Sequence, residues 1–192
     1  MYIAACCCEG ELVNRIEDWR RARNMVAIGN LGEQVAIRVL SRWGYHVLAT
    51  QEDLRGGVEN ILEMPTRMNP EDFVCVSPDG QLVTVNSKAT VSPRASGSDR
   101  DGNLLRPRIA KGQNTVEYTT VRGGLPSPVD GEVDGQVLKV DLVLMRAQLF
   151  AFDDAGRLYA GGPVENIAGD VQTVLRRYPD CPPPGPSAYD DL

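Results

Sequence analysis

The sequence is poor in the residues that build zinc sites and disulfide frameworks. It has one histidine, His46, and five cysteines, three of which are consecutive at Cys6 to Cys8, and it contains no C-x-x-C pair. Adjacent cysteines do not readily surround one ion tetrahedrally, and a disulfide framework requires cysteines spaced along the chain. We therefore expect neither a structural zinc site nor a disulfide-rich secreted domain, and we interpret His46 as a packing or edge residue rather than a ligand.

Long apolar runs are also absent. No stretch of about 18 apolar residues occurs, so the sequence contains no candidate membrane span. The segment before Glu9 has no positive region and is too short for a secretory signal. Hydrophobic residues make up 42% of the chain and charged residues 24%, as in soluble globular proteins. We therefore predict a cytoplasmic protein with no membrane partner.

Positive charge is scarce overall, because the formal net charge is −6. Binding to nucleic acid requires local positive potential, so the distribution of charge matters more than the total. Residues 94–111 carry five basic residues against two acidic ones, and we predict that the basic residues contact nucleic acid: Arg94, Arg100, Arg106, Arg108 and Lys111. Further arginines in residues 9–23 could touch phosphate, but we interpret them as a solvated helix face.

Apolar periodicity predicts two helices and a strand at the start of the chain. Residues 9–23 have the pattern of an amphipathic helix. We expect the second helix to be capped by Asn30, with Glu33 completing a capping box, and to end at Gly44. Residues 45–49 then read as a strand.

The later segments alternate between loops and strands. We expect an irregular insertion at 51–70 with a short strand or helical turn at 58–62, a polar loop at 91–108, and an acidic loop at 123–135. Residues 109–121 fit a short helix or a strand. Strands are predicted at 137–145, 147–152 and 157–160, and a closing helix at 163–177 with Pro163 in its first turn.

Residues 71–88 predict a β-hairpin around which the rest of the fold is organised. Pro78-Asp79-Gly80 suits a three-residue loop in which Gly80 adopts a left-handed conformation. This loop fixes a register in which Val76 faces Leu82 and Asp72 faces Asn86. Lys88 follows two residues later and points the same way. An acid, an amide and an amine therefore converge at the open end of the hairpin.

This group of side chains suits magnesium chemistry. Mg²⁺ prefers hard oxygen ligands, which Asp72, the Asn86 side chain, the Ser87 carbonyl and Glu33 could supply. Lys88 could orient a water molecule and stabilise charge that develops on a phosphate. Each residue also has a structural explanation, since Glu33 could cap its helix, Asp72 could begin a strand and Lys88 could be a solvated strand end.

The motif residues resemble a nuclease family. Gly32-Glu33-Gln34-Val35-Ala36, the helix ending at Gly44, the strand opened by Asp72 and the strand ending Asn86-Ser87-Lys88 resemble the PD-(D/E)xK nuclease superfamily. The closest likeness is to its Holliday-junction-resolvase-like and YraN-like members, over residues 29–90. The resemblance implies an α/β fold with a restriction-endonuclease-like mixed β-sheet flanked by helices.

The resemblance also implies roles for individual residues. Glu33 matches the helical glutamate, Asp72 the metal-binding aspartate and Lys88 the catalytic lysine, with Mg²⁺ or Mn²⁺ as cofactor. Gln113 could match a polar residue on the following helix. Asn86 stands where the family has an acid, which should lower metal affinity. Reading Pro78-Asp79 as the motif's acid is set aside, because a turn explains it better.

We expect three regions: an N-terminal helical extension at 1–28, a nuclease-like domain at 29–178, and an extended or disordered proline-rich tail at 179–192. Three functions follow. The first is a metal-dependent endonuclease acting on duplex or branched DNA, and a homodimer would be compatible with it. The second is an inactive nuclease-fold module that binds DNA or a protein. The third is an acidic interaction protein of a phage or defence system.

Overall fold

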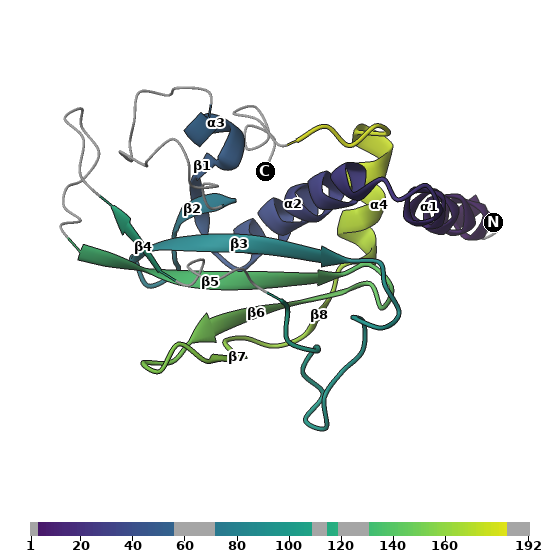
Figure 1. The fold of residues 1–192 in the computed structure, drawn as a ribbon. Coiled ribbons are helices and arrows are strands. Elements are labelled where there is room, and N and C mark those ends of the chain that lie inside the picture. Colours follow the sequence, from purple (N-terminus) through teal and green to yellow (C-terminus); the bar gives the residue numbers. More distant parts are fainter. Residues whose placement is uncertain (1–3, 56–71, 109–114, 119–130, 184–192) are drawn as a thin grey trace.

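The computed structural model describes residues 4–55, 72–108, 115–118 and 131–183, and side chains within 13–53, 72–108 and 135–183. These residues form a mixed α/β fold in which helices flank a mixed β-sheet (Figure 1). The helices are α1 (Ala4–Arg21), α2 (Met25–Arg42), α3 (Gln51–Arg55) and α4 (Ala168–Arg177). None of them is both long and apolar enough to cross a bilayer.

Within the described residues the sheet has eight strands: β1 (His46–Thr50), β2 (Phe73–Val76), β3 (Leu82–Thr90), β4 (Thr115–Tyr118), β5 (Gly131–Asp141), β6 (Arg146–Phe152), β7 (Leu158–Ala160) and β8 (Glu165–Asn166). The strand order is β1-β2-β3-β5-β6-β7, with β4 paired to β5 and β8 paired to β6. The β3–β5 pair is parallel, and the other pairs are antiparallel.

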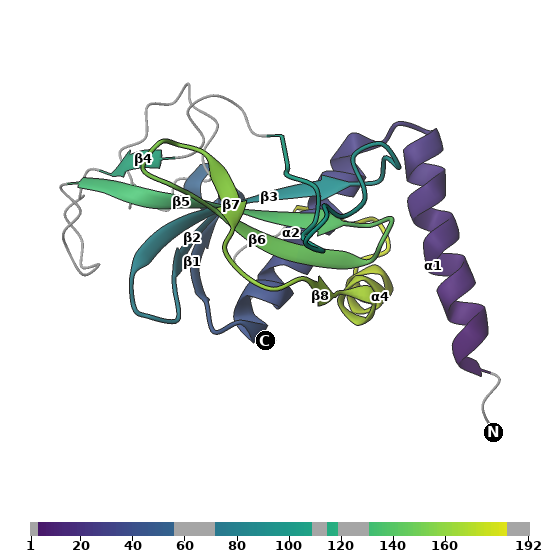
Figure 2. The ribbon, with the colours of Figure 1, turned by 90° about the horizontal axis from the view of Figure 1, so that it is seen from below.

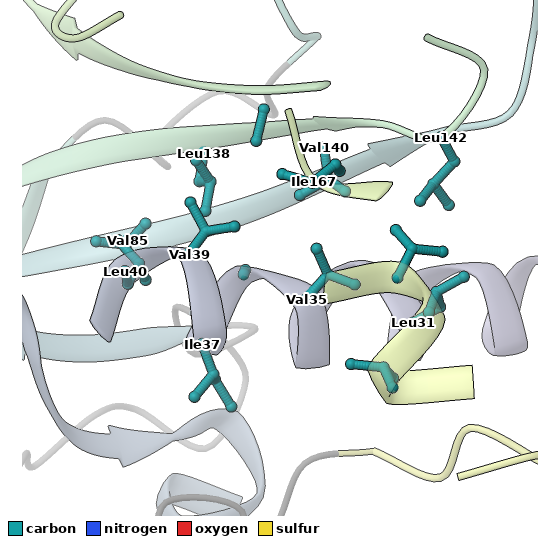
Figure 3. Close-up of a cluster of buried hydrophobic side chains, with 14 of the residues drawn as sticks. Leu31, Val35, Ile37, Val39, Leu40, Val85, Leu138, Val140, Leu142 and Ile167 are labelled. Atoms are coloured by element: carbon teal, nitrogen blue, oxygen red, sulfur yellow. The ribbon is translucent and has the colours of Figure 1, made fainter. Parts of the chain in front are cut away.

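The main core lies between the sheet and the face of α2 and α4. Because side chains alternate along a strand, Val83 and Val85 of β3 join this core, as do Leu138 and Val140 of β5 (Figure 3). A smaller cluster, containing Val137, lies on the opposite face of the sheet. Figure 2 shows α1 outside the sheet layer, at the end where α2 begins.

The hairpin is confirmed in detail. Val76 pairs with Leu82, and the register continues to Phe73 opposite Val85. Gly80 has φ +84 and donates its N–H to the Ser77 carbonyl at 2.9 Å. The predicted turn therefore sets the predicted register.

The start of α2 differs from the prediction. Its N-cap is Asn24, whose side chain accepts a hydrogen bond from the Ala27 N–H at 3.1 Å. Asn30 lies within the helix and donates its amide to the Cys181 carbonyl at 2.8 Å. Ala27 and Ile28 are buried, so the apolar face begins one turn before Asn30 and favours the earlier cap. The end at Gly44 is confirmed, since Gly44 has φ +82.

Several other boundaries also differ. α4 begins at Ala168 because β8 occupies part of the segment assigned to its first turn, so Pro163 lies outside the helix. β5 already starts at Gly131, inside the predicted acidic loop, and ends at Asp141 rather than Met145. Met145 adopts φ 50 in the turn that follows.

The segments at 51–70 and 109–121 are described only in part. The first begins with α3, a helix that the prediction missed, and the predicted element at 58–62 lies outside the described residues. The second contains β4, so its described part is a strand. The start of the predicted C-terminal tail is packed against the domain, because Cys181 is 1% exposed and contacts α2 through Asn30.

Candidate functional site

Asp72 lies immediately before β2 and is hydrogen-bonded to β3. Its Oδ2 accepts the Ser87 N–H at 2.7 Å, and its backbone carbonyl accepts the Gln51 N–H at 2.8 Å. A hydrogen bond to an ionised carboxylate is stronger than one between neutral groups. The Asp72 carboxylate therefore ties the open end of the hairpin together, and it sits against the Asn86-Ser87-Lys88 segment as predicted.

Asn86 is a fully buried polar residue at the open end of the hairpin. Its side chain is 0% exposed, and neither its oxygen nor its nitrogen has a hydrogen-bond partner among the described residues. The hydroxyl of the next residue, Ser87, lies on the opposite face of the sheet and is also buried without a partner in the part of the chain that the structure describes. Buried polar atoms without partners are costly, and in folded proteins ordered water or an ion commonly satisfies them.

Lys88 is half-buried, and within the described residues it makes no ion pair. Lys88 and Asn86 share a face of β3, because they are two residues apart. In the parallel register Lys88 pairs with Lys139 of β5, and Asn86 pairs with Val137. Lys88 therefore lies on the face opposite α2, next to the smaller cluster.

Glu33 lies on the other side of the sheet. The preceding residue, Gly32, packs so tightly on β3 that a Cβ there would stand 2.5 Å from the Ala89 Cβ and 3.6 Å from the Ser87 hydroxyl. Ser87 and Ala89 thus face α2, whereas Asn86 and Lys88 face away from it. The capping explanation for Glu33 is wrong, because the N-cap is Asn24.

The predicted nucleic-acid-binding arginines lie on the loop that follows β3. Arg94, Arg100, Arg106 and Arg108 are all exposed. Lys111 and Gln113 lie outside the described residues.

The structure also contains three buried polar side chains that the sequence did not single out. Lys139 and Asp141 of β5 and Gln148 of β6 are 2%, 0% and 0% exposed, and they face the loop that carries the arginines. The sequence predicts a strand at 137–145 but assigns no role to Lys139 or Asp141. The signal was present, because Lys139 and Asp141 alternate at the spacing of one strand face.

Two oxygen donors of this segment could contribute to a site for a hard cation. No three His, Cys, Asp or Glu side chains converge anywhere in the described ranges. Mg²⁺, however, usually takes only one or two carboxylates and completes its shell with water or phosphate. Asp72 offers a carboxylate, and Asn86 offers an oxygen that has no other described partner. The charge available to hold the ion is small, because Asn86 is neutral.

None of the family models, curated proteins and solved structures compared with the chain matches it.

Proposed function

We propose that this protein is a metal-dependent DNA endonuclease of the PD-(D/E)xK type, which hydrolyses phosphodiester bonds at the open end of the β2–β3 hairpin. The observation that carries the proposal is the hydrogen bond from the Ser87 N–H to the Asp72 carboxylate. It brings an acid to the Asn86-Ser87-Lys88 segment, and the same segment holds buried polar atoms without described partners.

The side chains divide the work by their chemistry. Asp72 and Asn86 would hold Mg²⁺ or Mn²⁺, which when bound polarises a phosphate and lowers the pKa of water. The positively charged ammonium group of Lys88 would stabilise negative charge on the phosphate and orient the attacking water. Glu33 lies on the α2 side of the sheet, so we assign it no direct contact with substrate.

A second candidate is a DNA-binding module of the same fold that does not cleave. The specific observation in its favour is Asn86, a neutral side chain that is 0% exposed. Without a second carboxylate, the cation is held weakly and the fraction of protein loaded with metal is small at ordinary concentrations.

The deciding experiment measures cleavage of supercoiled, linear, nicked and branched DNA with Mg²⁺ and with Mn²⁺. Asp72→Asn is the sharpest variant, because an amide oxygen still accepts the Ser87 N–H while the charge is lost. We expect Asp72→Asn and Lys88→Met to reduce cleavage at least a hundredfold. Asp154→Asn, an exposed aspartate in a turn, is the matched control and should cleave normally.

Asn86→Asp separates the two candidates. Cleavage by the natural protein, lost in Asp72→Asn, supports the endonuclease. DNA binding without cleavage, together with cleavage gained in Asn86→Asp, supports the binding module. If no variant cleaves and the natural protein does not bind DNA, both candidates fail.

A further inference from the structure

Lys139 is a buried ammonium that holds two distant points of one loop. It is 2% exposed, and its Nζ donates to the Ala95 carbonyl at 2.7 Å and to the Leu105 carbonyl at 2.6 Å. A buried lysine is tolerated only where its charge is compensated, and burial lowers its pKa while nearby Asp141 opposes that shift. The two carbonyls belong to the residues next to Arg94 and Arg106. One side chain therefore fixes the backbone beside both arginines.

Asp141 and Gln148 hold the loop at further points. Asp141 accepts the Ser96 hydroxyl at 2.9 Å and the Gly97 N–H at 3.4 Å. Gln148 accepts the Leu104 N–H at 2.7 Å, and its amide donates to Asn103 Oδ1 at 2.9 Å. Leu104 is itself 0% exposed in the smaller apolar cluster. Residues 91–108, which we call the arginine loop, are thus anchored to the sheet along both of their limbs.

The charges of the arginine loop point outward. Its tip is closed by hydrogen bonds from the Leu105 N–H to the Gly97 carbonyl at 2.9 Å and from the Asp99 N–H to the Asn103 carbonyl at 2.7 Å. The Asp99 carboxylate accepts the backbone N–H groups of Asp101 and Asn103, at 3.0 and 2.9 Å. The loop's arginines are exposed, and none forms an ion pair with a described residue.

The arginine loop lies on the same face of the sheet as Lys88. Lys88 pairs with Lys139 in the β3–β5 register, and Lys139 is the residue beneath the loop. Figure 1 shows the loop on the side of the sheet opposite α2. A phosphate bound near Lys88 would therefore have its neighbouring phosphates within the field of the exposed arginines.

We propose that the arginine loop is a preformed clamp for the phosphates of duplex DNA, and that Lys139 is a positioning residue that sets its shape from below. An anchored loop loses less conformational freedom on binding than a free one, so anchoring strengthens binding without a contact of its own. This inference rests on the proposed function for its partner. The anchoring itself can be tested without DNA.

The first test is limited trypsin digestion, with cleavage sites identified by mass spectrometry. We expect Lys139→Met and Ser96→Ala to speed cleavage at Arg94 and Arg100 about tenfold, because each removes an anchor. Cleavage at Arg157, which is exposed outside the loop, is the internal control and should not change. Ser96→Ala leaves the buried charges of Lys139 and Asp141 in place and alters only a half-buried loop residue. It therefore remains informative if Lys139→Met fails to fold. Equal cleavage in Ser96→Ala and the natural protein would overturn the anchoring.

The second test is binding of a short DNA duplex without divalent metal, across a series of salt concentrations. Arg94→Gln/Arg106→Gln should weaken binding and reduce the slope of log affinity against log salt by about 0.9 for each lost contact. Ser96→Ala should weaken binding severalfold without changing the salt dependence, because it loosens the arginine loop but removes no positive charge. Arg176→Gln on α4 removes one exposed positive charge outside the loop, and this control should bind normally.

The outcomes separate this inference from the proposed function. Faster trypsin cleavage combined with unchanged DNA affinity in both Ser96→Ala and Arg94→Gln/Arg106→Gln would refute the clamp. DNA cleavage could still be present in that case. Weaker binding in both variants, with no cleavage by the natural protein, would support the clamp and leave only the binding module as the function.

Discussion

The tight packing of α2 against β3 at Gly32 makes a testable prediction. A Cβ at this position would stand 2.5 Å from the Ala89 Cβ, whereas carbon atoms in contact are normally about 3.5–4.0 Å apart. Both atoms are attached directly to backbone, so no rotamer change relieves the clash. Gly32→Ala must therefore push α2 and β3 apart by about 1 Å.

The expected magnitude follows from two opposing effects. Forcing extra volume into a packed core costs about 1–3 kcal/mol, and replacing a helical glycine by alanine gains about 1 kcal/mol. Since the clash involves rigid atoms, we expect a net loss of about 2 kcal/mol in the free energy of unfolding. Gly29→Ala in the same helix is the control. Its Cβ would meet nothing within 4 Å, so this variant should be stabilised by up to about 1 kcal/mol.

Urea unfolding of the two variants and of the double variant Gly32→Ala/Ala89→Gly measures these effects. Removing the Ala89 methyl restores the space, so the double variant should be more stable than Gly32→Ala alone, although Ala89→Gly by itself costs about 0.5–1 kcal/mol. If Gly32→Ala proves as stable as Gly29→Ala, the close packing of α2 on β3 is refuted.

Two further predictions concern two asparagines near the start of α2 and the buried thiols. Asn24→Ala should lose about 1 kcal/mol and speed exchange of the Ala27 amide, whereas Asn30→Ala should leave that amide protected and expose Cys181 to alkylation. Burial raises the pKa of Cys75 to about 12 and that of Cys181 to about 11, so both should resist alkylation at pH 8 in the folded protein. The unfolded chain releases these protons first, near its ordinary pKa of 9.0, so stability should fall as pH rises above 9, by up to about 1.4 kcal/mol per pH unit for Cys75. A Cys75→Ala variant with an equally steep decline would contradict this assignment.

The hairpin was predictable because its determinants are local. Pro78-Asp79-Gly80 selects the turn, the turn fixes the register, and strand alternation then decides which face each residue takes. The start of α2 was less predictable. The sequence favours Asn30 because Glu33 would complete its capping box, whereas the cap at Asn24 depends on burial of Ala27 and Ile28, which is a tertiary effect.

Of the candidate site, the sequence predicted only the part that belongs to the β2–β3 hairpin. The sequence placed Asp72 near Asn86, but the hydrogen bond to the Ser87 N–H depends on Asp72 lying just outside the β2–β3 pairing. The side of the sheet on which Glu33 lies is decided by how α2 packs, and that in turn depends on the contact of Gly32 with Ala89. Lys139 was missed because its partners, Ala95 and Leu105, are distant in sequence.

Asn86 is where the stability of the fold and the proposed chemistry oppose each other. A carboxylate at this fully buried position would bind a cation better, yet without metal its charge would be desolvated and unpaired, which costs far more than burying an amide. Asn86→Asp should therefore lower the melting temperature in EDTA. A cation that binds only the folded state at a hundred times its dissociation constant restores about 2.7 kcal/mol, so Mg²⁺ should raise the melting temperature of Asn86→Asp much more than that of the natural protein. An Asn86→Asp variant that is destabilised but indifferent to both Mg²⁺ and Mn²⁺ would show that the open end of the hairpin does not hold a metal.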